Sequence, residues 1–327
     1  MRKIQTVLGP IEAHQLGRTL VHEHLYIRVA GGELDPKVGF DRAAFVVEAV
    51  RRLKDLKQHG VRTFVDPCPI ELGRDVTLMA EISEKAEMHL ICSTGFYYEA
   101  MGLPPYWRAR SAQQIADLYL HEIENGIGQT GIRPGVIKCA TGAPAITSME
   151  EKFLVAASIA QRASGLPILT HTNHVCGPEQ QAIFEKNGVP LHRCLIGHSC
   201  GNPDPLYHRE VVKRGSYIGF DRIGMLHYQP DSIRADNIKR LVDGGFLSRV
   251  LMSQDRYCYV HGGSSRSRSE EELRLMQEMQ AAGNWPPSYT YLFTDFIPML
   301  AERGISQGQI ETILDQNPRD FLAGLEN

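Results

Sequence analysis

The sequence lacks the cysteine pattern of a disulfide-stabilised protein. Its 327 residues contain seven cysteines, an odd number without a CxxC pair, so no disulfide framework is indicated. Several of these cysteines stand inside apolar runs, where cysteine is typical of a small core residue. We therefore expect the chain to work in a reducing, cytoplasmic setting.

Long apolar runs are also missing. No run approaches the roughly 20 residues that a membrane helix requires. The first segment, MRKIQTVLGPIEAHQ, has two basic residues but is interrupted by Gln5, Pro10, Glu12 and His14. A secretory leader needs an uninterrupted apolar core at this place. We therefore expect neither a membrane segment nor a leader.

An excess of charge of one sign is absent as well. The formal net charge is -3 and the sequence pI is about 6.5, whereas nucleic-acid binding calls for a basic patch. We expect no nucleic-acid partner, and a neutral or mildly charged small molecule fits this composition better.

Linkers, low-complexity tracts and abrupt changes of composition are not found either. The hydrophobic content of 43% over 327 residues is enough for a large core, and length alone would allow one large domain or two ordinary ones. The even composition favours one domain over residues 1–327.

What the sequence does contain is a regular alternation of apolar strand-like runs and helical patterns. Eight runs rich in apolar and β-branched residues are bounded by Gly, Pro or polar residues and predict strands. The predicted strands are 19–24, 61–66, 89–94, 135–140, 167–171, 194–198, 216–221 and 249–255. Helical periodicity lies between and after them, at 41–58, 74–87, 111–126, 148–164, 178–187, 204–214, 234–245, 288–303 and 306–315.

This alternation favours a parallel sheet with helical crossovers, and eight units match a closed (β/α)8 barrel. The alternative is an open doubly wound sheet. That architecture usually carries a glycine-rich phosphate-binding turn after its first strand, and the segment TLVHEHL (19–25) is not one. We therefore predict a (β/α)8 TIM barrel.

Six possible metal-ligating side chains stand at or near the ends of the predicted strands. In such a barrel, strand ends and the loops that follow them form the catalytic face. Six groups far apart in sequence would thereby meet on one rim. They are His22, His24, Lys138, His171, His198 and Asp255.

The four histidines predict a metal site only as a group. His22 and His24 are two residues apart on an extended segment, which aims both rings to the same side. An HxH pair can also arise by chance, and a single histidine at a strand end, such as His171 or His198, is more often structural. Imidazole is nevertheless a favoured ligand of zinc and similar divalent metals, and four in this arrangement favour ligation.

Lys138 and Asp255 extend the same hypothesis. An ammonium buried inside a barrel is unfavourable without a partner. Between two divalent cations a neutral amine could take up carbon dioxide and become a bridging carbamate. Lys138 could instead point outward between helices, and Asp255 could be a helix cap or a salt-bridge partner. In the metal hypothesis Asp255 is a carboxylate ligand and a proton acceptor.

These segments together resemble the phosphotriesterase family of the amidohydrolase superfamily, over nearly the whole chain. The segment STGFYYEA (93–100) and the short N-terminal part are most similar to the phosphotriesterase-like lactonases of that family. The motifs that carry the resemblance are GRTLVHEHL (17–25), GIRPGVIKCA (131–140), LTHT (169–172), IGHSCGNPDPLYHRE (196–210), FDRIG (220–224), MSQD (252–255) and QNPRDFL (316–322).

The resemblance implies a role for each of the six residues. His22, His24 and Asp255 would hold the more buried of two divalent metals, and His171 and His198 the more exposed one. Lys138, carboxylated by CO2 to N6-carboxylysine, would bridge the two together with a hydroxide. Zinc is the default metal by ligand type, and cobalt, manganese or iron also suit these ligands.

The resemblance further implies lactone hydrolysis by attack of the bridging hydroxide, with Asp255 passing the proton to the departing alkoxide. Tyr97 would lie beside the hydroxide and orient the substrate. Arg222 matches a position that lines the substrate pocket, although a structural ion pair is an equally good interpretation. Weak phosphotriester hydrolysis is an expected side activity, and the resemblance points to a homodimer.

The long connection 256–287 is the expected substrate loop, because long loops in compact domains are usually functional or disordered. Tyr257, Tyr259 and Trp285 give it aromatic surface. Arg266 and Arg268 could bind an anionic substituent, or they could be solvated residues ahead of a helix capped by Ser269 with Glu270 to Glu272 in its first turn. The loop sequence matches no pattern of known specificity.

Two rival functions remain open. One is a carboxylester or N-acyl amide hydrolase on the same metals, and the other is a catalytically silent barrel that binds a ligand or partner.

Overall fold

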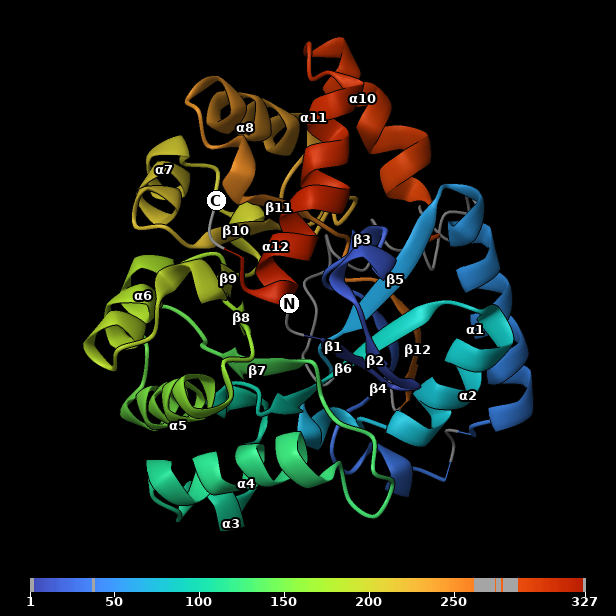
Figure 1. Ribbon diagram of the computed structural model, residues 1–327, viewed down its shortest axis with the longest axis vertical. Coiled ribbons are helices and arrows are strands. Elements are labelled where there is room, and N and C mark those ends of the chain that lie inside the picture. Colours follow the sequence, from blue (N-terminus) through green and yellow to red (C-terminus); the bar gives the residue numbers. More distant parts are fainter. Residues whose placement is uncertain (1–2, 37–38, 262–273, 275–277, 279–287, 326–327) are drawn as a thin grey trace.

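A parallel eight-stranded sheet forms the centre of the molecule (Figure 1). The computed structural model describes residues 3–36, 39–261 and 288–325, together with 274 and 278. The strand order is β11, β10, β9, β8, β7, β6, β5, β3, and each neighbouring pair is parallel. The strands are β3 (Arg18–Leu20), β5 (Val61–Asp66), β6 (His89–Gly95), β7 (Val136–Ala140), β8 (Ile168–His171), β9 (Cys194–Ile196), β10 (Tyr217–Phe220) and β11 (Val250–Met252).

The two ends of this sheet are joined just beyond its ladder. The Asp255 N–H donates to the His22 carbonyl at 3.0 Å, and the His24 N–H donates to the Arg256 carbonyl at 2.7 Å. Further along, β4 (His24–Arg28) pairs in parallel with β12 (Tyr257–His261). These bonds bring the first and last strands together at their carboxyl ends. The sheet is therefore a nearly closed (β/α)8 barrel, as predicted.

Helices surround the barrel (Figure 1). Polar side chains cap several of their N-termini: Asp41, Asp75, Ser111 and Thr147 each accept a backbone N–H of the first turn. The helices are α1 (Arg42–Gln58), α2 (Val76–Ala86), α3 (Pro105–Arg108), α4 (Ala112–Asn125), α5 (Ser148–Ser164), α6 (Gly177–Lys186), α7 (Pro205–Lys213), α8 (Asp231–Asp243), α10 (Ile297–Glu302), α11 (Gln307–Glu311) and α12 (Asn317–Ala323), with π-helical turns at Leu292–Phe296 and Thr312–Gln316.

The core has two parts that follow from the alternation of side chains along each strand. One set of residues lies between the strands and the helices. A second set fills the barrel, where Val65, Leu169 and Leu251 belong to one cluster with Ile4 near the N-terminus and Phe321 of α12. The hairpin of β1 (Ile4–Thr6) and β2 (Gly9–Ile11) and helix α12 cross the barrel end shown in Figure 1. The opposite end, formed by the carboxyl ends of the strands, is left for function.

Several boundaries differ from the predictions. The strand predicted at 19–24 is two strands, β3 and β4, separated by a bend at Val21 and His22. The strands predicted at 194–198 and 249–255 end at Ile196 and Met252, and the positive φ angles of His198 and Asp255 exclude these two residues from a strand. Strands β1, β2 and β12 and helices α3 and α12 were not predicted, since each is short or lies outside the alternating pattern.

Within the expected substrate loop, 256–287, the structure describes the beginning, 256–261, and the single residues 274 and 278. Residues 257–261 form β12, whereas Arg266, Arg268, Ser269, Glu270 to Glu272 and Trp285 lie outside the described residues. Within the part of the chain that is described, none of the helices has the length and apolar character needed to cross a bilayer.

Candidate active site

Strand alternation turns Lys138 and His171 into the barrel. Val136 belongs to the interior core, and Lys138, two residues further along β7, faces the same way. Leu169 and His171 repeat this relation on β8. The exposed fraction is 1% for Lys138 and 2% for His171, so both polar groups lie inside the protein above the apolar filling.

His22 and His24 reach the same region by a different route. The bend between β3 and β4 carries His22 out of the regular ladder. The Nε2 atoms of both rings then face one carboxylate oxygen, Asp255 Oδ1, at 3.6 Å for His22 and 3.3 Å for His24. Lys138 Nζ lies 3.3 Å from His22 Nε2. The predicted convergence of these residues therefore occurs, although not on a straight strand.

His198 and Asp255 both stand beyond their strands in the left-handed backbone region, with φ of 58° and 53°. Residues other than glycine rarely adopt this conformation, and it tends to persist at functional sites where the surroundings hold it. It directs His198 Nε2 to within 3.7 Å of Asp255 Oδ2. His22, His198 and Asp255 can each offer a ligand atom within 4.8 Å of one another.

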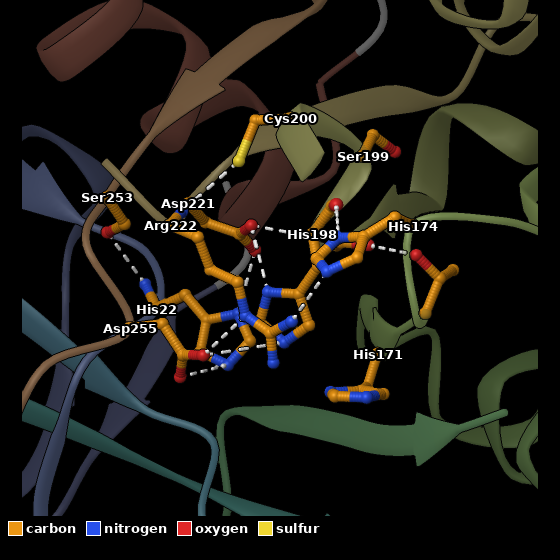
Figure 2. A network of polar contacts seen from close by, with 12 residues as sticks. His22, His171, His174, His198, Ser199, Cys200, Asp221, Arg222, Ser253 and Asp255 are labelled. Carbon is orange, nitrogen blue, oxygen red and sulfur yellow. Dashed lines mark hydrogen bonds and ion pairs between the residues drawn. The ribbon is translucent and has the colours of Figure 1, made fainter. Parts of the chain in front are cut away.

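Asp221 is one of the residues that sequence reasoning missed. It follows β10, has no exposed surface, and accepts from His22 Nδ1 at 2.8 Å and from His198 Nδ1 at 3.1 Å (Figure 2). An ionised carboxylate only accepts hydrogen bonds, so both Nδ1 atoms carry the proton and the Nε2 atoms are free to bind a metal. Asp66 holds His24 Nδ1 in the same way at 2.9 Å. Asp221 stands in the FDRIG motif, directly before Arg222, where alternation from Tyr217 places it inside the barrel.

Burial lowers the pKa of most of these groups. It lowers the pKa of His22 to about 4 and that of His198 to about 3, and moves the pKa of His171 well below its usual value. It also lowers the pKa of Lys138 to about 8. His24 is the exception. Burial acts to lower its pKa, but hydrogen bonds from the ring to the Asp255 and Asp66 carboxylates outweigh burial and raise the pKa to about 9.

This donor set fits divalent metals. Imidazole nitrogens with their Nδ1 atoms fixed by carboxylates, together with the Asp255 carboxylate, are the ligands that zinc and similar cations prefer. Lys138 contacts a histidine nitrogen rather than a carboxylate, and a carbamate on this amine would add the anionic ligand that two cations need. The set is therefore a candidate metal centre, in which His22, His198 and Asp255 already lie close enough to share an ion.

Comparison with known proteins decides the family. A model of the Phosphotriesterase family matches residues 2–322. An aryldialkylphosphatase from Saccharolobus solfataricus is 34% identical, with 96% of this chain and 97% of that protein covered. A phospho-furanose lactonase from Mycoplasmopsis synoviae is 31% identical, with coverage of 98% and 91%. A mutant of a PTE-like lactonase from Deinococcus radiodurans superimposes with a TM-score of 0.89 at 34% identity, covering 98% of this chain and 99% of that one.

The chain belongs to the phosphotriesterase family. It is a hydrolase of that family, and the resemblance noted in its motifs is confirmed. The family match runs almost from end to end, so the metal-ligand candidates of the phosphotriesterase motifs all fall inside it.

The remaining candidates of this phosphotriesterase-family site surround the cluster. Tyr97, two residues after β6, bonds through its hydroxyl to His171 Nδ1 at 3.0 Å, while His171 Nε2 bonds to Asn173 Oδ1 at 3.0 Å. A metal on His171 would replace one of these partners. Tyr257 opens β12 beside His24 in the strand register.

Arg222 contacts the cluster directly. Its Nε donates to Asp255 Oδ2 at 2.9 Å, its Nη1 lies 3.4 Å from His174 Nε2, and its guanidinium lies 4.7 Å from the centre of the Tyr228 ring. Figure 2 shows Arg222 among His22, His198 and Asp255, with His171 set apart below them. Both interpretations of Arg222 are thus compatible with its position, because the ion pair to Asp255 lies at the edge of the site.

Proposed function

We propose that this protein opens lactones by metal-assisted hydrolysis, with γ- and δ-lactones and acyl-homoserine lactones as the substrate class. The observation that carries the proposal is the convergence of His22, His24, His198 and Lys138 around Asp255 at the carboxyl ends of the strands. The lactonase names of two similar proteins support the substrate class.

The chain supplies candidate ligands for two divalent cations. Zinc is the expected metal, and cobalt, manganese or iron are alternatives. His22, His24 and Asp255 would hold one, His171 and His198 the other, and Lys138 as a carbamate would serve both. When bound, the cations would activate water at neutral pH and polarise the substrate carbonyl. Incorporation of 13C-labelled bicarbonate, seen by NMR in the wild type and lost in Lys138→Met, would identify the carbamate.

Asp255 is the proton acceptor in this proposal. Its Oδ1 faces the two histidines of the HxH pair and its Oδ2 faces Arg222. Its side chain is 12% exposed, more than any of its histidine neighbours. It can therefore take a proton on the substrate side and return it to the departing alkoxide.

Tyr97 and Arg222 orient the substrate. The Tyr97 hydroxyl next to His171 can donate to a lactone oxygen, and the Arg222 guanidinium can donate to a carbonyl or an anionic substituent while it remains paired with Asp255. Tyr257, next to His24, would line the same space. A phosphoryl oxygen can occupy the place of the carbonyl, so slow phosphotriester hydrolysis accompanies the lactonase activity.

The test is a pH-indicator screen of the metal-loaded protein over γ- and δ-lactones, acyl-homoserine lactones, aryl esters, N-acyl amides and paraoxon, with elemental analysis. We expect lactones to react fastest and Asp255→Asn to lose at least about a hundredfold in rate. Reaction only with N-acyl amides or only with phosphotriesters would retain the site and reject the substrate class. Full turnover by Asp255→Asn or after complete chelation would reject the mechanism, and a preparation from metal-supplemented cells without metal would favour the silent barrel.

The same proposal includes a homodimer that works in the cytoplasm, as expected from the family resemblance and from the cysteine pattern. Light scattering after gel filtration measures the oligomeric state, and cell fractionation measures the location in the cell. A monomer at micromolar concentration or a membrane-bound fraction would reject the corresponding expectation.

A further inference from the structure

Glu23 stands between the two histidines of the HxH pair and has no part in the mechanism above. It has no exposed surface. Its Oε1 accepts the Gln254 N–H at 2.7 Å and its Oε2 accepts the Arg256 N–H at 2.9 Å. Both oxygens of one buried carboxylate thus bind the two residues that flank Asp255.

Asp255 itself is held by the same segment. Its N–H donates to the His22 carbonyl at 3.0 Å, so three consecutive N–H groups, from residues 254 to 256, end on residues 22 and 23. The backbone of Asp255 has a φ of 53°, a conformation that a residue with a side chain keeps only when its surroundings impose it. The N–H groups on either side of it both donate to Glu23, and further bonds hold the Arg256 carbonyl and the Gln254 side chain.

We infer that Glu23 is a positioning residue that fixes the Asp255 carboxylate by clamping the peptide groups on both sides of it. The carboxylate so placed lies 3.3 Å from His24 Nε2, 2.9 Å from Arg222 Nε and 3.7 Å from His198 Nε2. A rotation of the 254–256 backbone would move these contacts together. One short segment, 22–24, thus supplies two metal-ligand candidates and the clamp for a third.

The test compares Glu23→Gln with Glu122→Gln. Glu122 is a buried glutamate of α4 that binds Arg74 through both oxygens, and it lies outside the active site. In Glu23→Gln one of the two backbone N–H groups faces an amide N–H instead of an acceptor, whereas the side chain keeps its size. Glu122→Gln therefore controls for the loss of one buried carboxylate.

Three measurements separate positioning from plain stability. Hydrogen exchange of metal-free protein, followed in a peptide that covers 250–257, should become at least tenfold faster in Glu23→Gln and remain unchanged in Glu122→Gln. The visible spectrum of the cobalt-substituted protein should change only in Glu23→Gln. Turnover per loaded site should show kcat lowered about a hundredfold with KM within threefold, because the clamp acts through Asp255 rather than on substrate.

Glu23→Asp keeps the charge but is one methylene shorter, so it can reach only one of the two N–H groups, and it serves if Glu23→Gln fails to fold. We expect an effect in the same direction. The inference would be overturned if a folded Glu23 variant kept the hydrogen exchange, cobalt spectrum and kcat of the wild type. It would also be overturned if Glu122→Gln showed the same changes as Glu23→Gln. The kinetic readout rests on the proposed function. If the wild type opens no lactone, the proposed function is rejected. Hydrogen exchange and the cobalt spectrum still test whether Glu23 positions the 254–256 backbone.

Discussion

Asp221 is the residue on which both halves of the candidate metal centre depend, because its two oxygens hold one histidine expected on each metal. Asp221→Asn would turn one oxygen into an N–H donor that opposes an imidazole N–H. We expect metal affinity to fall about 10–100-fold, the usual effect of removing such a partner. Competition with a chromophoric chelator measures this.

Asp231→Asn is the matched control for that substitution. Asp231 is equally buried and accepts from Gly224 and Arg234, but it does not contact the candidate ligands. Its variant should lose stability without losing metal affinity. Equal metal affinity of Asp221→Asn and wild type would show that the histidine orientation does not depend on Asp221.

Glu71 gives the site region a pH dependence of stability. Its Oε1 accepts the Tyr97 N–H at 2.7 Å, and none of the described residues forms a hydrogen bond with its buried Oε2. Burial raises the pKa of Glu71 from 4.5 to about 7. At a pH between 4.5 and 7, Glu71 keeps its proton in the folded protein, whereas in the unfolded chain it has lost it. The free energy of unfolding therefore falls as the pH rises from 4.5 to 7, by on the order of 2 kcal/mol.

Glu71→Gln removes this dependence and keeps the acceptor for Tyr97. We expect its unfolding free energy relative to wild type to increase from pH 5 to pH 8, measured by urea unfolding. The exposed Glu124→Gln should show no such trend. A difference between Glu71→Gln and wild type that is constant across this range would mean that Glu71 titrates normally.

At the scale of elements, the approach of β6 to β7 depends on one glycine. Gly95 is paired with Lys138 in the register, and a Cβ at Gly95 would lie 1.9 Å from the Lys138 carbonyl oxygen. Gly95→Ala would therefore push apart the strands that carry Tyr97 and Lys138. We expect Gly95→Ala to lower the free energy of unfolding by about 3 kcal/mol or more, because the backbone clash adds to the strain of a side chain at a φ of 119°.

Gly102→Ala is the control for the backbone strain alone. Gly102 has a φ of 95°, and a Cβ there meets nothing within 4 Å. Gly102→Ala should lower the free energy of unfolding by only about 1 kcal/mol. Thermal unfolding and metal content measure both variants, and similar losses in the two would show that the β6–β7 contact can yield.

The sequence was informative about elements wherever the barrel is regular. All-buried runs such as those of β8 and β10 are typical of parallel strands covered on both faces, and the count of eight then indicated the barrel. Boundaries failed where the site departs from regular geometry. His198 and Asp255 close two of the predicted strands, but their left-handed backbones exclude them from these strands, which end at Ile196 and Met252.

Partners of the candidate ligands were harder to predict than the ligands themselves. Histidines at strand ends are visible in the sequence because their chemistry is unusual there. Asp221 and Glu23 stand in the same motifs, yet aspartate and glutamate are common on any surface. Only the fold shows that Asp221 meets His22 across 199 positions, and that Glu23 meets Gln254 across 231.

At the scale of the whole molecule, the seam of the barrel and the candidate active site coincide. The first and last strands meet through residues 22–24 and 254–256, and these segments also contain three of the six candidate ligands. Metal bound at this seam would join the two ends of the sheet. The apolar filling below and the helical layer outside need no metal, so the barrel should fold without it and be less stable.

We therefore expect removal of metal to lower the melting temperature without loss of fold. With free metal at about a thousand times its dissociation constant, binding stabilises the native state by about 4 kcal/mol, which corresponds to a shift of roughly 5–10 °C for a chain of this size. Calorimetry before and after dialysis against a chelator measures the shift, and circular dichroism checks that secondary structure persists. Asp255→Asn, which lacks one of the candidate ligands at the seam, should show a smaller shift in melting temperature than wild type. A wild-type melting temperature that does not respond to chelation, in protein shown to have lost its metal, would mean that the seam holds by hydrogen bonds alone.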